Sequence, residues 1–182
     1  MTSPKTALYT VAYPEVDADA RQRIDAFRAL HDAHARSLIG PHFTLLFACS
    51  EVDETAYRWH VQAVVEDTGA IEFCCRYAML GATHHDETAS IYLVPDEGFS
   101  QISLLHDRLY RGTMAEHLRL DIPYLPHISI GMPGSGAAAK ALCDEWNAAP
   151  TEIRGLIRSA TVGAVQDGRF KNRATYMMRG SG

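Results

Sequence analysis

Two short segments of this 182-residue chain have the same order of residue types. Residues 41–47 read PHFTLLF and residues 126–132 read PHISIGM, so in each a histidine follows a proline and precedes a hydroxyl residue by two positions. Alternate side chains of a β-strand point to one face, about 6.5–7 Å apart. Each segment is therefore expected to present one imidazole and one hydroxyl together, with its apolar residues packed on the opposite face.

The four polar side chains, His42, Thr44, His127 and Ser129, suit phosphodiester hydrolysis. One neutral imidazole can accept a proton from an attacking water and one imidazolium can protonate the leaving oxygen, because the ordinary histidine pKa is about 6.5. The hydroxyls can donate hydrogen bonds to phosphoryl oxygens, where negative charge gathers in the transition state. This scheme uses no metal ion and no cofactor.

A single histidine on a strand is usually a packed or surface residue, and one His-x-Ser/Thr triplet arises by chance in many proteins. Two copies with the same preceding proline, at matching points of a recurring structural unit, favour a shared chemical role. Other candidate sites are weaker. The segment 84–86 (HHD) suggests a metal site but has no matching distant ligands, and no histidine is placed to activate Cys49.

Strand and helix patterns alternate around both motifs. Strands are predicted at residues 8–13, 41–48, 70–82, 88–94, 126–132, 153–165 and 169–178. Helices are predicted at residues 17–35, from an N-cap at Ser50 to residue 67, at 98–118, and from the 131–136 turn to residue 147. The turn at residues 84–87 makes a hairpin of the third and fourth strands.

The order strand, turn, helix and hairpin occurs around residues 41–94 and again around residues 126–178. Two such units facing each other predict an α+β fold with two pseudo-symmetric lobes of mostly antiparallel sheet, outer helices and a central cleft. Residues 1–182 are expected to form a single bilobal domain.

The composition and charge of the chain indicate which kinds of partner it can bind. Apolar residues make up 47% of the chain and charged residues 21%, as in globular proteins, and no apolar run reaches the roughly 20 residues of a membrane helix. The spacing of the four cysteines shows no disulfide framework, which favours a location in the reducing cytoplasm. The net charge of −5 argues against an extended nucleic-acid surface. Residues 152–182 nevertheless carry six basic and two acidic residues, which form either a solvated strand face or a cationic rim for a small anion.

The motif segments 41–47 and 124–130 resemble those of the 2H phosphoesterase superfamily, which is defined by two His-x-Ser/Thr motifs on two related lobes. The resemblance covers nearly the whole chain in motif placement and strand–helix order. Within the superfamily, the chain is similar to bacterial 2′-5′ RNA ligase-like proteins and to cyclic phosphodiesterases. The resemblance implies that His42 and His127 are the general acid and base, without saying which is which, and that Thr44 and Ser129 bind phosphate.

Relatives commonly offer an aromatic ring to a base or ribose, and Tyr13 is the nearest counterpart here; Tyr124 is a candidate for the rim. The chain has no tryptophan near Tyr13 and no aromatic residue at Gly131 or Met132, where some relatives have one. The resulting hypothesis is a metal-independent phosphoesterase acting on a small, cyclic nucleotide phosphodiester or a short RNA end. Two alternatives remain open, a nucleotide- or RNA-binding module and a 2′-5′ RNA end-joining enzyme.

Overall fold

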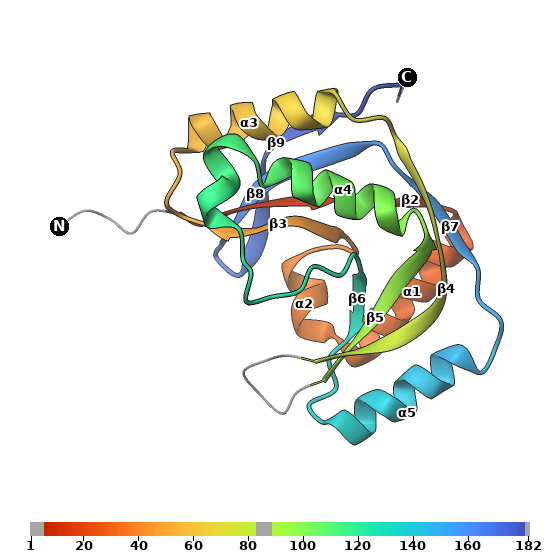
Figure 1. Ribbon diagram of the computed structural model, residues 1–182. Coiled ribbons are helices and arrows are strands. Elements are labelled where there is room, and N and C mark those ends of the chain that lie inside the picture. The colour runs from red at the N-terminus through yellow and green to blue at the C-terminus, as the bar shows by residue number, and fades with distance from the viewer. Residues whose placement is uncertain (1–5, 83–88, 181–182) are drawn as a thin grey trace.

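The computed structural model describes residues 6–82 and 89–180, which fold into two antiparallel sheets with helices packed outside them (Figure 1). The strands are β1 (Leu8–Ala12), β2 (Glu15–Val16), β3 (Phe43–Cys49), β4 (Ile71–Ala82), β5 (Ala89–Glu97), β6 (Ile128–Gly131), β7 (Ile153–Ile157), β8 (Ser159–Gln166) and β9 (Arg169–Met177). The helices are α1 (Ala18–His31), α2 (Ala33–Leu38), α3 (Glu54–Glu66), α4 (Phe99–Leu109), the 3₁₀ helix η1 (Gly112–His117) and α5 (Gly136–Asn147). The predicted α+β class is confirmed.

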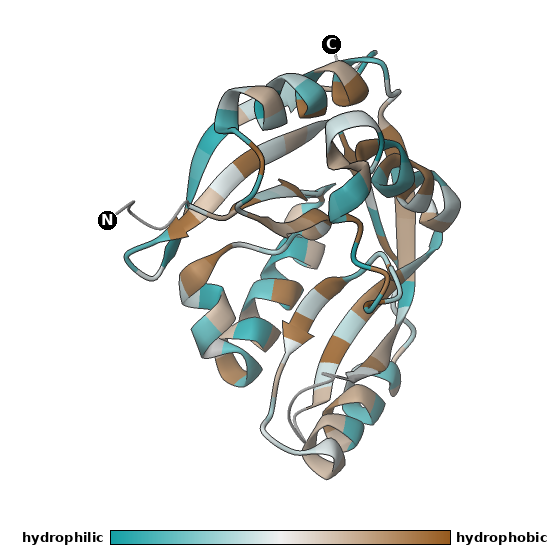
Figure 2. Ribbon diagram, turned by 60° about the vertical axis from the view of Figure 1, so that its left-hand side comes forward, coloured by the Kyte–Doolittle hydropathy of each residue, from teal (hydrophilic) through white to brown (hydrophobic). Residues whose placement is uncertain are grey.

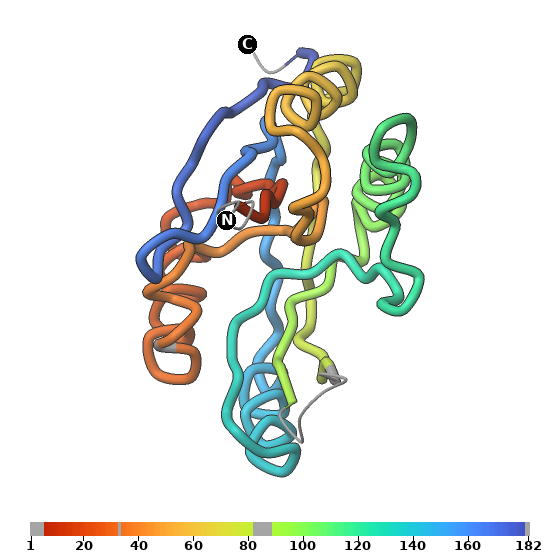
Figure 3. The backbone as a smooth tube through the Cα atoms, turned by 90° about the vertical axis from the view of Figure 1, so that its left-hand side faces the viewer, coloured from red at the N-terminus to blue at the C-terminus, as the bar shows by residue number. Residues whose placement is uncertain are grey.

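The first sheet has the strand order β3-β1-β8-β9 and the second has the order β2-β7-β4-β5-β6. Neighbouring strands in both sheets run antiparallel. The two motif strands, β3 and β6, are each the edge strand of their own sheet. Figures 1 and 3 show the start of β3 and the chain entering β6 side by side at the centre of the molecule.

Each sheet combines strands from both halves of the sequence. The β4–β5 hairpin, which follows β3 and α3, joins the sheet that contains β6. The β8–β9 hairpin, which follows β6 and α5, joins the sheet that contains β3. The two recurring units are therefore present, but each contributes its hairpin to the opposite lobe. This exchange gives the pseudo-symmetric pair of lobes and holds the two motif strands against a common centre.

Several predicted boundaries were wrong. The expected helix at residues 17–35 is divided at Asp32, whose side chain accepts a hydrogen bond from the Ala35 N–H (3.3 Å) and caps a new helix, α2. Asp53, rather than Ser50, caps α3. The expected strand at 153–165 is divided at Arg158, because β7 pairs with β4 in one sheet and β8 with β1 in the other.

Other predicted ends moved by smaller amounts. The expected helix at 98–118 ends at Leu109 and continues after a turn as η1. The expected motif strands begin one residue after each histidine, at Phe43 and Ile128. The predicted turn at residues 84–87 and the HHD segment at 84–86 lie outside the described residues.

The hydrophobic core joins the two sheets. Phe43 of β3 packs edge to face on Phe73 of β4, with ring centroids 5.1 Å apart, and both rings are buried. Helices α1 and α3 add Ile24 and Tyr57, which are also buried. Figure 2 shows the helices striped in brown and teal, as expected where one face packs on a sheet and the other meets water. Among the described helices, none is both long and apolar enough to span a membrane.

Candidate functional site

The two motif segments meet where the edge strands of the sheets approach each other. His42 directly precedes β3 and His127 directly precedes β6. The Tyr124 hydroxyl, just before the second motif, donates a hydrogen bond to the Thr44 carbonyl in the first (3.0 Å). Thr44 and His127 line the same hollow. The fold therefore places two segments far apart in sequence around one cavity.

Each imidazole is held in the same way by its own backbone. His42 Nδ1 donates to the Gly40 carbonyl (2.8 Å), and His127 Nδ1 donates to the Leu125 carbonyl (2.7 Å). A carbonyl oxygen only accepts, so the hydrogen must be on Nδ1 in both rings. The Nε2 atom of each neutral ring is then left with a lone pair that can accept a proton. The equivalence of the two motifs thus extends to the hydrogen bond that sets each tautomer.

The surroundings of both rings favour the neutral form. Burial lowers the pKa of His42 to about 4, against the raising effect of the Gly40 carbonyl, and the charges of Arg28 and His127 lower it further. Burial also lowers the pKa of His127, partly offset by the Leu125 carbonyl. Because His127 acts on the pKa of His42, the two imidazoles are within electrostatic reach of each other.

Each motif hydroxyl is two residues beyond its imidazole, on one of the two edge strands. Thr44 is directly opposite Val11 of β1 in the sheet register, and Ser129 is directly opposite Tyr92 of β5. Both side chains are half-buried. Over residues 6–82 and 89–180, neither hydroxyl has a hydrogen-bond partner, so both can donate to a ligand.

Tyr13, the ring predicted to meet a base or ribose, packs beside His42. The two ring centroids are 6.4 Å apart at an interplanar angle of 64°, which is an edge-to-face contact. Tyr13 follows β1 and is two residues beyond Val11, so it shares the sheet face of Thr44. Tyr13 also lines a second hollow, separate from the one that His127 lines.

Tyr124, the candidate for the rim, lines the hollow beside His127. Its ring stacks on the His106 imidazole, with centroids 3.5 Å apart and planes within 6° of parallel. His106 Nδ1 in turn donates to the Leu45 carbonyl (2.8 Å). Together with the Tyr124–Thr44 hydrogen bond, this stack attaches the segment before β6 to the backbone of β3.

Tyr92 is a site residue that the sequence did not reveal. Its ring stacks on the His127 imidazole, with centroids 3.8 Å apart and an interplanar angle of 26°. The ring lies over Gly81 of β4, where an added Cβ would come within 1.9 Å of a ring carbon. Only glycine at position 81 leaves room for Tyr92 to pack against the histidine. No local pattern around Tyr92 signals this role, because it depends on how three strands pair.

The hollow beside His127 has a volume of about 440 Å³ and is lined mainly by aromatic and aliphatic side chains. Its walls are formed by Thr44, Phe47, Met79, Leu80, Gly81, Tyr92, Ile122, Pro123, Tyr124, Leu125 and His127. Apolar walls with a few converging polar groups are typical of a small-molecule site. Such a cavity can accept a planar ring while a phosphoryl group lies against the imidazole.

One group of metal-ligand types occurs within the described ranges, at the far end of β3. The ligand atoms of Cys49, Glu51 and His117 lie within 4.8 Å of one another, and His117 Nδ1 is 2.8 Å from a Glu51 carboxylate oxygen. None of the three lines the hollows beside the two histidines. The expectation that no histidine is placed near Cys49 was therefore wrong, because His117 is, although Cys49 lines neither hollow.

The family model described as the 2′-5′ RNA ligase superfamily matches residues 14–169. Among curated protein sequences, none matches this chain significantly. Similar solved structures include E. coli LigT with 3′-AMP (TM-score 0.63, 17% identity, 96% of this chain and 99% of that one). E. coli LigT with NADP⁺ gives TM-score 0.61 at 17% identity, covering 96% and 98%, and TT0787 of Thermus thermophilus gives 0.62 at 12%, also covering 96% and 98%. At these identities the structures show that the fold is shared.

Proposed function

Because this chain belongs to the 2′-5′ RNA ligase superfamily, we propose that it is a phosphoesterase that hydrolyses a small nucleotide phosphodiester, in particular a cyclic one, between His42 and His127. One observation carries the proposal: two imidazoles from equivalent positions have Nδ1 bound to backbone in the same way, leaving both Nε2 atoms for chemistry. A module that only binds nucleotides needs positive charge but has no use for two such proton carriers.

In the proposed reaction, His42 is the general base and His127 is the general acid. Nε2 of His42 accepts a proton from water as the water oxygen bonds to phosphorus. Nε2 of His127 donates a proton to the leaving oxygen as its bond to phosphorus breaks. The assignment rests on the difference between the two rings: burial lowers the pKa of His42 to about 4 and lowers that of His127 by less, so His127 is the more readily protonated. Solvent exchange then restores both protonation states.

The negative charge of the bound substrate favours protonation of the general acid, His127. Both imidazoles are biased toward the neutral form in the free protein, because burial lowers both pKa values. A bound phosphodiester is an anion, and a nearby negative charge raises the pKa of an imidazole. The Thr44 and Ser129 hydroxyls donate to the phosphoryl oxygens, where they stabilise the charge of the transition state. No step of this scheme requires a metal ion.

The hollow beside His127 supports a nucleotide as the substrate. Its aromatic walls, including Tyr92 and Tyr124, are suited to the face of a base. LigT, a structural neighbour, has been crystallised with 3′-AMP and with NADP⁺, both of them nucleotides. The four cysteines of the present chain are free, which is consistent with the cytoplasm as the proposed location.

Hydrolysis of adenosine 2′,3′-cyclic phosphate in the presence of EDTA tests the proposal. We expect turnover by the wild type and a loss of about 10²–10⁴-fold in His42→Ala and in His127→Ala. His34→Ala, at an exposed position on α2, is the matched control and should retain full activity. Full activity in either motif variant would exclude the two-histidine mechanism. Binding without turnover in the wild type would instead support the binding-module alternative.

A further inference from the structure

A second hollow, which shares no lining residue with the aromatic one, lies near His42. It has a volume of about 510 Å³ and is lined by Tyr13, by residues 36–40 after and within α2, and by residues 170–172 of β9. It adjoins the imidazole directly, because Tyr13 packs against His42 and the Gly40 carbonyl accepts from its Nδ1. A ligand with a phosphodiester at His42 could therefore extend a second group into this hollow.

Its charge differs from that of the chain as a whole. Arg36 and Lys171 line it, and no carboxylate does, although the chain has a net charge of −5. Neither side chain has an ion-pair or hydrogen-bond partner in the part of the chain that the structure describes. Both side chains are exposed, and two unpaired cations on one shallow hollow attract an anion.

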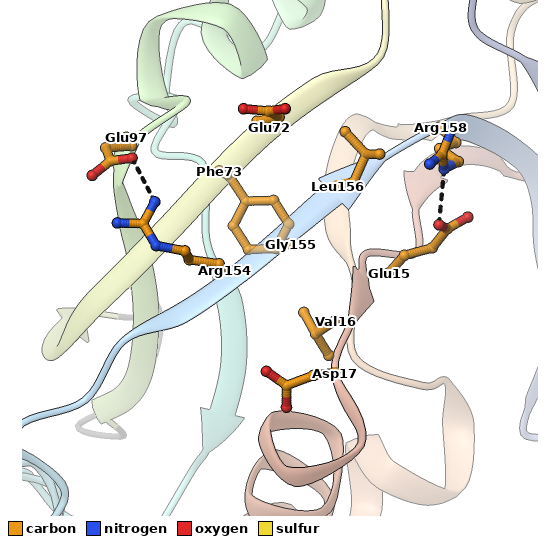
Figure 4. A pocket seen from close by; sticks show the side chains of 10 residues that line it. All are labelled: Glu15, Val16, Asp17, Glu72, Phe73, Glu97, Arg154, Gly155, Leu156 and Arg158. Carbon is orange, nitrogen blue, oxygen red and sulfur yellow. Dashed lines mark hydrogen bonds and ion pairs between the residues drawn. The ribbon is translucent and has the colours of Figure 1, made fainter. Parts of the chain in front are cut away.

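A hollow at strands β2, β4 and β7 of the other sheet provides the contrast (Figure 4). Four carboxylate residues and two arginines line it, and each arginine is paired. Arg154 is 3.1 Å from a Glu97 oxygen, and Arg158 is 3.0 Å from a Glu15 oxygen. Those cations are already neutralised, so that hollow is not an anion site. Of the six basic residues at 152–182, Lys171 is the one that lines the hollow next to His42.

A buried arginine adds positive charge beneath residues 36–40, which line the hollow. Arg28 of α1 is 1% exposed, and its Nη2 donates to the Ile39 carbonyl (2.9 Å) in the segment that walls the hollow. Its Nε and Nη1 have no hydrogen-bond partner, and no described carboxylate lies within ion-pair distance. The charges of Asp32 and Asp25 offset only part of the cost of burying Arg28, because burial still lowers its pKa, and an anion across residues 36–40 would offset more of that cost.

We propose that the hollow walled by Arg36 and Lys171 binds a second phosphoryl group of the substrate, so that the preferred substrates are nucleotide phosphodiesters carrying an additional phosphate. This inference rests on the proposed function. The aromatic hollow takes the base, the two histidines take the phosphodiester that is cleaved, and the cationic hollow takes the second phosphate. Arg36 and Lys171 thus determine specificity and take no part in proton transfer.

The test compares adenosine 2′,3′-cyclic phosphate with its 5′-monophosphate and 5′-diphosphate derivatives. In the wild type, we expect at least one of the two 5′-phosphorylated derivatives to have a kcat/KM about tenfold or more above that of the parent compound. The reason is that each contact to a phosphate is charge-assisted. Arg36→Ala and Lys171→Ala should each reduce this ratio of kcat/KM values toward one. For the compound without a 5′-phosphate, kcat/KM should stay within about twofold of the wild-type value. Arg173→Ala, an exposed cation on the same strand that does not line the hollow, controls for net charge and should retain the preference.

The outcomes separate this inference from the proposed function. Equal kcat/KM for all three compounds in the wild type would overturn the second-phosphate site while leaving the phosphoesterase assignment intact. An equal loss on all three compounds in Arg36→Ala or Lys171→Ala would do the same. If the wild type cleaves none of them, the proposed function fails. Calorimetric dissociation constants for the same compounds, measured in His127→Ala with and without Lys171→Ala, then test the site without catalysis. Tighter binding of the 5′-phosphorylated compounds that Lys171→Ala removes would support the site, and equal binding of all three would overturn it.

Discussion

Lowering the pH should destabilise the folded protein through His42. The pKa of this imidazole is about 4 in the folded chain, against about 6.5 for an unfolded histidine. Above pH 6.5 both states are neutral, and the group has no effect on stability. Between about pH 6.5 and 4 the unfolded chain binds a proton that the folded chain does not, so the free energy of unfolding falls with pH.

The size of this effect follows from the two pKa values. The complete loss is about 3 kcal/mol at about 1.36 kcal/mol per tenfold change in protonation. Between about pH 7.5 and pH 5 the His42 contribution alone is about 2 kcal/mol. His127 adds to the loss in the same direction, because burial lowers its pKa as well.

Urea unfolding of the wild type and His42→Gln at pH 7.5 and pH 5 measures the effect. Glutamine has no proton to gain in this range, so the variant should lose about 2 kcal/mol less than the wild type. Taking the difference removes the contributions of carboxylates that titrate in both proteins. His34→Gln, at an exposed position, should behave as the wild type does. Equal losses in the wild type and His42→Gln would refute the assignment of a half-buried, neutral imidazole.

Three further substitutions probe the cavity. Gly81→Ala should displace the Tyr92 ring from His127 and raise KM for a cyclic nucleotide, whereas Ala78→Gly, in the same strand, should not; an unchanged KM in Gly81→Ala would contradict the stacking role. Thr44→Val should lower kcat by about 10²-fold with little change in the melting temperature, because the hydroxyl acts on the transition state. Tyr124→Phe should cost about 1 kcal/mol in urea unfolding by removing the hydrogen bond to the Thr44 carbonyl, and no loss would argue against that bond.

The pairing of an imidazole with a hydroxyl in each motif is predicted from local sequence alone. His42 and Thr44 are two residues apart, so the strand period alone predicts that they face the same way. His127 and Ser129 follow the same rule, and the repeated pattern indicated that the two pairs belong together. The hydrogen bonds from the two imidazoles to carbonyls two residues upstream are equally local, but no side-chain pattern predicts them.

Features that depend on pairing between distant strands could not be predicted. Tyr92 reaches His127 because β5 pairs with β6 and because Gly81 on β4 leaves room for the ring. Arg158, where one strand becomes two in different sheets, has no glycine or proline on either side to mark the change. Arg36 and Lys171 come together only when α2 and β9 fold onto the same hollow.

A crystal structure of the protein with inorganic phosphate tests the central claim most directly. We expect one phosphate in the cleft, with oxygens within hydrogen-bond distance of Nε2 of His42 and His127 and of the hydroxyls of Thr44 and Ser129. A phosphate bound elsewhere, with the space between the two imidazoles filled by protein side chains, would contradict the claim.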